Sequence, residues 1–215
     1  SANAMLTPGK SLGFEAARML SPAGRCQSFD AAANGYVRAE GCGSFALLPA
    51  RQSEISDIAA LAAAVRQDGR SASLTAPRGV AQQRLLSEAL SLGGRRGSDV
   101  TAVEAHGTGT ALGDPIEAGA VAAAKLSKWG VSSDPLIVGC LKANAGHTEP
   151  GAGLAGALKL LMQLQYGSMA PNAQLRVMNM HVNASLQGHT EACVLPTQAC
   201  ALNSTLAGGV SSFGY

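Results

Sequence analysis

The sequence predicts an α/β domain whose sheet is at least partly parallel. Short apolar runs typical of buried strands alternate along the chain with longer runs of helical character, which is the pattern of strand–helix–strand units. Glycine and proline separate many of these runs. The chain has 215 residues, of which 47% are hydrophobic and 14% are charged, so it can bury a substantial core.

Four short apolar runs are interpreted as strands. They are residues 44–48, 100–103, 135–141 and 206–212. The first run is closed by Pro49, and its continuous apolar character is typical of a buried strand. The second and third runs each lead toward a segment that contains histidine.

Three further segments are predicted to be helical from composition and periodicity. Residues 57–65 are rich in alanine, and propensity alone favours a helix there. Residues 80–92 place leucine and alanine on one face and stop at two glycines. Residues 153–166 form the longest of these segments, and Gly167 follows as the expected end.

A fourth helix, over residues 118–126, has the fullest start signal in the chain. Asp114 is expected at the N-cap, Pro115 at the first helical position and Glu117 at the third. This spacing predicts a capping box, in which the cap side chain and the later carboxylate each bind a backbone amide of the other.

Charge and cysteine content exclude several classes of protein. The net charge of +2 is spread without charged runs, so neither nucleic acid nor an acidic membrane surface is expected as a partner. The five cysteines are odd in number and form no CxxC pair, which argues against a disulfide framework or a zinc site and favours a reducing compartment. Lys159 and Gln163 interrupt the best apolar run, so no membrane span is expected. We expect a cytoplasmic protein, with an organelle as the alternative.

Two histidines are the candidates for chemistry. His106 and His147 each follow a predicted strand and have glycine neighbours. Ligands of open α/β sheets gather beyond the carboxyl ends of the strands, and glycine lets a substrate approach the backbone. Thr108 and Thr110 add hydroxyls and Lys142 adds a cation in the same two loops. The other two histidines, at positions 181 and 189, have no such setting and are interpreted as structural.

Two competing kinds of site are disfavoured. His147 and Glu149 form a His-x-Glu pair, as in zinc deaminases, but the Pro-Cys-x-x-Cys partner is absent, so no metal is expected. Residues 151–156 fit GxGxxG, but a proline rather than a strand precedes them and no acidic residue follows until Glu191. These glycines are better explained by tight packing of a helix.

Several motifs together resemble the ketosynthase (β-ketoacyl synthase) domain of type I polyketide synthases. They are EAHGTGT at 104–110, GDPIE at 113–117, KANAGH at 142–147, FDAAANGYVR at 29–38 and SSFG at 211–214. The two histidine motifs have the order and separation found in that family. The resemblance covers nearly the whole chain.

The resemblance implies a thiolase-like fold of two similar halves in αβαβα layers, normally dimeric. Residues 1–50 would be the end of the N-terminal half. Residues 51–215 would be the C-terminal half, cut short before its final strand. The resemblance also implies a strand at residues 59–65, against the helix that propensity favours.

The activity implied by the resemblance is a decarboxylative Claisen condensation of an acyl thioester with malonyl-acyl carrier protein. His106 and His147 match the pair that stabilises the enolate and the thioester oxyanion. Lys142 matches the lysine that supports the second histidine. No cofactor is bound directly, since the substrates are carried on the phosphopantetheine of an acyl carrier protein. The other expected partners are the remaining ketosynthase half, the neighbouring synthase domains and a second copy of the chain.

Three further residues match substrate-binding positions of the family. Thr108 and Thr110 match positions that bind the phosphopantetheine arm, and Phe213 matches a gating phenylalanine beside the nucleophile. Asp114 and Glu117 are interpreted as structural, because they order the turn and the helix that follow His106.

The resemblance also implies a cysteine nucleophile, and no cysteine of this chain resembles it. The family carries it in an Ala-Cys-Ser-like turn upstream of residue 29. The cysteines present are Cys26, Cys42, Cys140, Cys193 and Cys200. We therefore expect this chain alone to be inactive. The alternative is a non-catalytic ketosynthase-like scaffold or chain-length subunit, which the retained histidines and lysine argue against.

Overall fold

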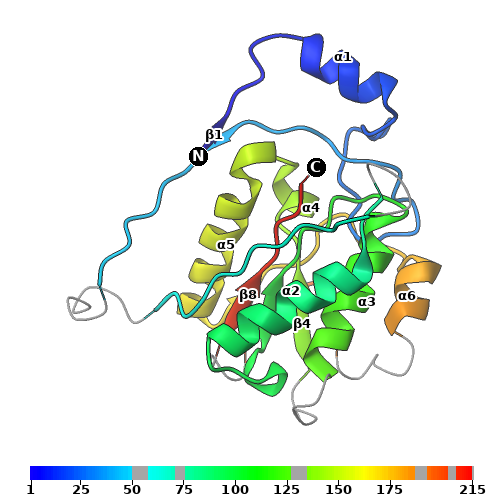
Figure 1. Ribbon diagram of the computed structural model, residues 1–215. Helices are drawn as coiled ribbons and strands as arrows, with labels where there is room; N and C mark the ends of the chain where they lie inside the picture. The colour runs from blue at the N-terminus through cyan, green and yellow to red at the C-terminus, as the bar shows by residue number, and fades with distance from the viewer. Residues whose placement is uncertain (50–57, 71–75, 127–134, 187–192, 203–206, 215) are drawn as a thin grey trace.

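A four-stranded parallel sheet lies at the centre of the computed structural model, which describes residues 1–49, 58–70, 76–126, 135–186, 193–202 and 207–214 (Figure 1). The strand order is β6-β4-β3-β8, and all three pairings are parallel. The strands are β3 (Ala102–Glu104), β4 (Leu136–Gly139), β6 (Cys193–Val194) and β8 (Gly208–Val210). The predicted α/β class with a parallel sheet is therefore confirmed.

Helices cover both faces of this sheet. On one face, α3 (Gly113–Leu126) and α6 (Met180–Leu186) pack on the strands, and α2 (Gly79–Leu92) lies along α3. On the other face lies α5 (Ala152–Tyr166), beside the short antiparallel pair β5 (Ser168–Met169) and β7 (Cys200–Ala201). The result is a helix–sheet–helix sandwich (Figure 1).

The side chains of β3 alternate between the two faces of the sheet, and this explains why both faces are covered by helices. Val103 and Ala105 belong to the core under α3, whereas Ala102 packs with Leu160 of α5. Side chains of successive strand residues point to opposite faces, so a strand that is apolar at every position needs a cover on each side. The continuous apolar runs of the sequence predicted this arrangement.

Glu104 is the polar exception on the α5 side of β3. Its carboxylate pairs with Lys159 Nζ of α5 at 2.6 Å and also accepts the backbone N–H of Leu141. A Cβ on Gly156 would lie 3.0 Å from the Glu104 side chain. The glycines of the GxGxxG segment therefore permit close packing of α5, as the sequence predicted.

The N-terminal residues form a separate arm at the top of Figure 1. Helix α1 (Gly9–Ala16) has no buried residue, and β1 (Ala2–Asn3) pairs antiparallel with β2 (Gly41–Cys42). The remaining short elements are η2 (Gly97–Asp99), α4 (Lys142–Ala145) and η3 (Glu149–Gly151). Among the described residues, no helix combines the length and the apolar character needed to span a membrane.

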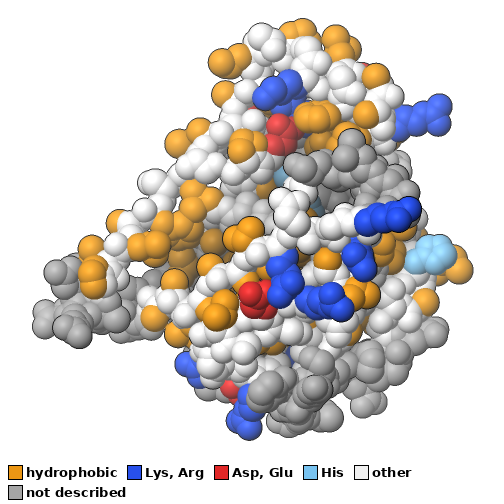
Figure 2. Space-filling view, in the orientation of Figure 1, with side chains coloured by type: hydrophobic (Ala, Val, Ile, Leu, Met, Phe, Trp, Pro, Cys, Tyr) orange, Lys and Arg blue, Asp and Glu red, His pale blue; other side chains and the backbone are white. Residues whose placement is uncertain are grey.

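Two predicted elements are wrong. Residues 44–48 form no strand, and Leu47 and Leu48 are 80% and 55% exposed. Residues 58–65 are neither helix nor strand, although alanine propensity favoured the first and the family resemblance the second. Residues 44–48 run away from the sheet, whereas residues 58–65 return toward the end of α2, where a Cβ on Gly93 would lie 3.6 Å from those of Leu61 and Ala62. Figure 2 shows hydrophobic side chains on the surface of this part of the molecule. An apolar run becomes a buried strand only where a neighbouring strand pairs with it, and none does so in the described residues.

The other predicted elements agree with the structure apart from their ends. The helices expected at 80–92, 118–126 and 153–166 are α2, α3 and α5. The strand expected at 100–103 is β3, which begins at Ala102 and ends one residue later than expected, at Glu104. In the run expected at 206–212, residue 206 and its neighbours at 203–205 lie outside the described residues.

Candidate active site

The loop that carries His106 is held by two carboxylates of α3. Glu117 accepts the backbone N–H groups of His106 and Gly107, each at 2.7 Å. Asp114 accepts those of Gly109 and Thr110 with Oδ1, at 3.1 and 3.3 Å. The predicted capping box is therefore wrong, because α3 begins at Gly113 and both carboxylates bind the preceding loop. The structural role predicted for them agrees with these contacts.

Burial makes both carboxyls unusual acids. Burial raises the pKa of Asp114 to about 7, and the charge of Glu117 adds to the rise while the Phe29 amide, which donates to Asp114 Oδ2 at 2.7 Å, opposes it. Burial also raises the pKa of Glu117, against the amides of Gly107 and His106. In each of these hydrogen bonds a carboxylate oxygen is the acceptor, so the loop geometry favours the ionised forms.

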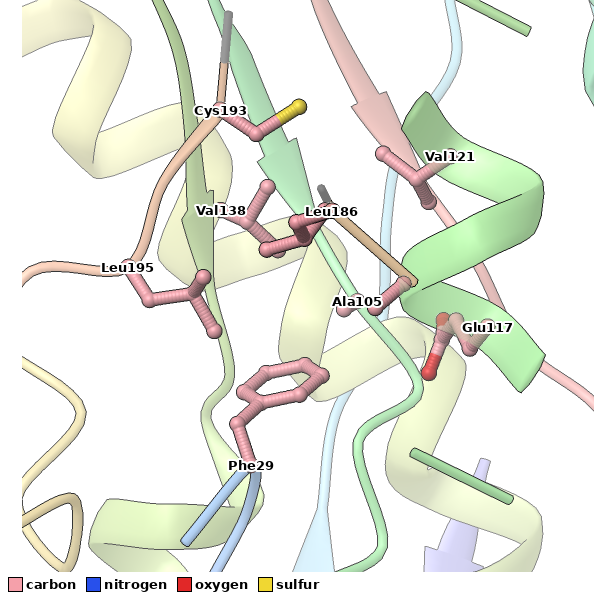
Figure 3. Close-up of a pocket in the computed structure, with 9 residues that line it drawn as sticks. Phe29, Ala105, Glu117, Val121, Val138, Leu186, Cys193 and Leu195 are labelled. Carbon is pink, nitrogen blue, oxygen red and sulfur yellow. The ribbon is translucent and has the colours of Figure 1, made fainter. Parts of the chain in front are cut away.

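An apolar pocket lies behind Glu117 and explains its desolvation. Figure 3 shows this pocket between the sheet and the helices α3 and α6. It is lined by Phe29, Ala105, Glu117, Ala118, Val121, Val138, Leu186, Cys193 and Leu195. Its walls offer a carboxylate no solvation, so the Glu117 charge is stabilised by the two amides of the histidine loop and by the positive charge of Lys142.

His147 reaches the same place from the neighbouring strand. It follows β4 and the single helical turn α4, and its backbone pairs with residues 37–39. Its N–H donates to Val37 O at 2.8 Å, and Ala39 N–H donates to His147 O at 2.9 Å. Gly146 precedes it at φ 81°, where a Cβ would lie 3.0 Å from that of Ala39. The glycine thus permits this close approach of two chain segments.

The two imidazoles meet at the carboxyl ends of adjacent strands. Their ring centroids lie 5.5 Å apart at an interplanar angle of 85°. Phe213, beyond β8, packs edge-on against His106 at 5.6 Å, and Tyr36 packs against His147 at 5.0 Å. The structure therefore brings together three of the predicted site residues from three separate strands.

Backbone amides fix the tautomer of both histidines. Phe213 N–H donates to His106 Nδ1 at 3.4 Å, and Glu149 N–H donates to His147 Nδ1 at 3.0 Å. An Nδ1 that accepts a hydrogen bond carries no proton, so in the neutral ring the proton is on Nε2. Each imidazole therefore presents an Nε2–H donor.

Both rings are held neutral. Burial lowers the pKa of His106 to about 2, helped by the positive charge of Lys142 and by the nearby His147 ring, with which a second imidazolium would be repulsive. Burial also lowers the pKa of His147 to about 4, helped by Lys142 and opposed by Glu149. Lys142, the first residue of α4, is itself buried at 5% exposure. Its charge disfavours imidazolium at both positions.

The two predicted threonines lie together in the His106 loop but are engaged within it. Thr108 Oγ1 and Thr110 Oγ1 are 3.3 Å apart, and Thr110 Oγ1 accepts the N–H of Gly113 at 3.2 Å. Both side chains are half-buried. They flank the turn from His106 into α3.

All five cysteines have free thiols. Cys26, Cys140 and Cys193 are buried, and burial raises the pKa of Cys140 to about 11. Cys140 Sγ donates to Gly107 O at 3.0 Å, and Ser28 Oγ lies 3.4 Å from that sulfur. Cys42 is exposed in the N-terminal arm, and Cys200 is half-buried in β7. A nucleophilic thiol needs a lowered pKa, whereas burial raises the pKa of the thiols of Cys26, Cys140, Cys193 and Cys200.

Sequence reasoning missed three residues at this site. Tyr36 and Arg38 lie in the block at 29–38 that resembles the family, yet neither was predicted to have a role. Glu149 was predicted only as a disfavoured metal ligand. Tyr36 packs on His147, and Arg38 forms an ion pair with Glu149 beside the same ring. The contacts join positions about a hundred residues apart, and spacing along one sequence gave no sign of them. His181 is exposed on α6, and residue 189 lies outside the described residues.

Comparison with known proteins agrees with this arrangement. The model of the β-ketoacyl synthase C-terminal domain matches residues 58–176, and that of the β-ketoacyl synthase N-terminal domain matches residues 1–53. A phenolphthiocerol/phthiocerol polyketide synthase of Mycobacterium tuberculosis is 39% identical over 99% of the chain. Erythronolide synthase EryA3 of Saccharopolyspora erythraea is 45% identical over 77% of the chain.

Solved ketosynthase structures superpose closely. The oxazolomycin ketosynthase domain OzmH KS7 of Streptomyces albus matches 99% of the chain with a TM-score of 0.89 at 30% identity. The ketosynthase from module 6 of the bacillaene synthase of Bacillus subtilis matches 94% with a TM-score of 0.83 at 28% identity. The chain spans 12% of the length of the mycobacterial synthase, 5% of the length of EryA3 and 38% of the OzmH chain.

Proposed function

The chain belongs to the β-ketoacyl synthase family of acyltransferases, with the thiolase-like fold of polyketide-synthase ketosynthases, and we propose that it supplies the two-histidine part of a condensing site. The observation that carries the proposal is the pair of neutral imidazoles, 5.5 Å apart, each with Nδ1 bound to a backbone amide. That arrangement presents two Nε2–H donors at the edge of the sheet.

The proposed reaction is decarboxylative condensation. A malonyl thioester on the carrier loses carbon dioxide, and the electrons of the broken C–C bond form an enolate. The enolate carbon then attacks the carbonyl of an acyl thioester held on a cysteine. A new C–C bond forms, the C–S bond breaks and the thiolate leaves. His106 and His147 donate Nε2–H hydrogen bonds to the thioester oxygens on which negative charge develops.

The remaining predicted residues have supporting roles in this proposal. Lys142 keeps both imidazoles neutral, so that each ring donates from Nε2–H and keeps an unprotonated Nδ1 to accept its backbone amide. Phe213 lies against His106 and contributes its backbone N–H, which supports a role at the mouth of the acyl site. Thr108 and Thr110 are proposed to bind the phosphopantetheine arm through hydroxyls at the start of α3.

The acyl-carrying thiol is proposed to come from outside these 215 residues. The raised pKa of Cys140 and the burial of Cys26 and Cys193 support this, because each of these thiols is kept protonated. A ketosynthase-like scaffold or chain-length subunit would also lack the thiol. The two oriented imidazoles favour the enzyme, since a scaffold has no use for aimed donors.

The proposed partners follow from the reaction. They are a phosphopantetheinylated acyl carrier protein, the remaining ketosynthase residues and neighbouring synthase domains, and a second copy in a homodimer. No directly bound cofactor or metal is required, and the cytoplasm is the proposed compartment, with an organelle as the alternative. We place the boundary between the ends of the two ketosynthase halves near residue 50.

Malonyl decarboxylation by the complete ketosynthase domain tests the proposal. We expect His147→Ala to lower carbon dioxide release by roughly 10²- to 10³-fold, the effect of removing one oxyanion donor. The matched control is His181→Ala, an exposed histidine on α6, which should release carbon dioxide at the normal rate. Normal release from His147→Ala would contradict the assignment. The 215-residue chain alone should form no condensation product, and product formation would show that one of its own cysteines serves as nucleophile.

A further inference from the structure

A largely buried ion pair lies directly beside His147. Arg38 Nε meets Glu149 Oε1 at 2.5 Å, and Nη2 meets Oε2 at 3.1 Å, so the contact is bidentate. The side chains are 5% and 15% exposed. Replacing such a pair by apolar residues of similar size is often neutral or stabilising, so stability alone does not explain why this site contains one.

Glu149 has an unfavourable backbone conformation. Its φ is 48°, in the left-handed region that residues other than glycine rarely adopt. Pro150 follows it, and a residue before proline is further restricted toward extended conformations. Such a conformation persists only where the surroundings impose it. The bidentate contact to Arg38 is the interaction that restrains the Glu149 side chain.

The strained residue is also the one that sets the His147 tautomer. The Glu149 N–H donates to His147 Nδ1 at 3.0 Å, and its direction depends on the backbone angles at that position. We propose that Arg38 and Glu149 are positioning residues, whose ion pair holds the Glu149 amide against His147 Nδ1 and so keeps the Nε2–H donor aimed into the site. This inference rests on the donor role proposed for His147.

Arg38 is itself anchored from two directions, which makes it a firm support. Its backbone is bridged to that of His147. Its guanidinium donates to Ser11 Oγ at 2.7 Å and lies over the Phe14 ring at 5.4 Å. Both of those residues belong to α1, so the positioning contact reaches from the N-terminal arm to the histidine.

The His147 tautomer can be read directly by two-bond ¹H–¹⁵N correlation spectra of the ¹⁵N-labelled 215-residue chain. In Arg38→Gln we expect the ratio of Nε2–H to Nδ1–H forms of His147 to fall by roughly two- to tenfold, the range that one net hydrogen bond confers. Glu149→Ala should cause a larger fall than Glu149→Gly, because glycine accepts the positive φ without strain. The matched control is Arg66→Gln, which breaks the exposed 2.5 Å pair with Glu88 and should leave both histidines unchanged.

His106 provides the internal reference in each spectrum, because its Nδ1 is held by Phe213 rather than by Glu149. A native tautomer ratio for His147 in Arg38→Gln would overturn the inference. An equal change at both histidines would also overturn it, since that indicates general loosening of the site. The readout needs no substrate, so the result is independent of whether the site decarboxylates malonyl thioesters.

Discussion

The two imidazoles owe their protonation state to backbone amides and burial rather than to a carboxylate partner. Each Nδ1 accepts an N–H, and Lys142 disfavours a second proton on either ring. A carboxylate bound to Nδ1 would instead favour imidazolium, which suits a general base and not a donor held neutral. The chemistry at the scale of single residues therefore supports the proposed role in oxyanion binding.

The lowered pKa of His147 predicts a pH dependence of folding stability. The unfolded chain titrates near 6.5 and the folded site near 4, so the unfolded state binds more protons between these values. Stability from this residue is thus complete above about pH 6.5 and is lost as the pH falls toward 4. Asp114 acts oppositely, because its raised pKa of about 7 stabilises the fold at low pH. The measurement must therefore compare variants.

We expect His147→Gln to gain stability relative to the native chain as the pH is lowered through this window. The gain should approach about 1–3 kcal/mol, since each unit of pKa shift corresponds to about 1.4 kcal/mol. Urea unfolding at several pH values measures it. Parallel pH profiles for the two proteins would contradict a His147 that is held neutral in the folded state.

Even the replacement of Glu117 by its isosteric amide should lower the stability of the fold. Both of its carboxylate oxygens accept buried N–H groups, whereas glutamine offers one oxygen and places an NH₂ against the other donor. We expect Glu117→Gln to lower the free energy of unfolding by about 1–3 kcal/mol, the cost of one unsatisfied buried donor. Denaturant unfolding tests this, with the exposed Glu88→Gln as the control. Equal stability of the two variants would show that Glu117 does not hold the loop.

At the scale of elements, the turn from β3 into α3 depends on a glycine that no other residue can replace. Gly109 has φ 76°, and a Cβ there would lie 2.8 Å from the backbone nitrogen of Gln27. Gly167 ends α5 with a similar φ of 63° but has nothing within 4 Å. Both positions require a positive φ, and they differ only in the space that a Cβ atom would have.

This pair separates backbone strain from steric exclusion. Gly167→Ala should cost about 1–2 kcal/mol, the penalty of an L-residue in the left-handed region. Gly109→Ala should cost clearly more and should also displace His106, because a backbone atom cannot move aside as a side chain can. Thermal unfolding measures both. Equal costs would mean that the loop shifts freely, and the site would then be less rigid than its contacts indicate.

Local sequence signals predicted the elements that pack on the sheet. Helices α2 and α5 end at glycines where expected, and β4 is apolar throughout because both of its faces are covered. The two wrong predictions discussed next, the strand at 44–48 and the capping box, have a different origin. Residues 44–48 have the composition of a strand but no pairing partner among the described residues. The carboxylates of α3 accept N–H groups of the preceding loop rather than N–H groups at the start of the helix. Tertiary contacts determine this pairing.

At the scale of the whole molecule, the sequence predicted a site at His106 and His147 because strand ends of a parallel sheet meet at one edge, whereas Phe213 was predicted from the family resemblance. It did not predict the contacts around them. Arg38 and Glu149 are 111 positions apart, and Phe213 approaches His106 from 107 positions away. The approach of Phe213 follows from the pairing of β3 with β8, and that of Arg38 from its backbone bridge to His147. Neither periodicity nor spacing along the sequence reveals these pairings.

The exposed apolar segments make a prediction about association. Leu47 and Leu48 lie in a stretch without a strand partner in the described residues, and Leu61 is 48% exposed in the second such stretch. Unpaired extended apolar segments invite pairing between chains. The solved ketosynthases contain further residues beyond the part that this chain matches, since it spans 38% of the OzmH chain.

We therefore expect the 215-residue chain to self-associate as its concentration rises, and Leu47→Ser with Leu48→Ser to reduce that association. Sedimentation velocity at several concentrations measures it. Leu92→Ser is the matched control, because Leu92 is 62% exposed at the end of α2, a helix whose backbone groups are bonded internally. A monomer at every concentration would contradict the prediction. An equal effect of Leu92→Ser would assign the association to general hydrophobicity and not to the extended segment, because only the segment can pair as a strand.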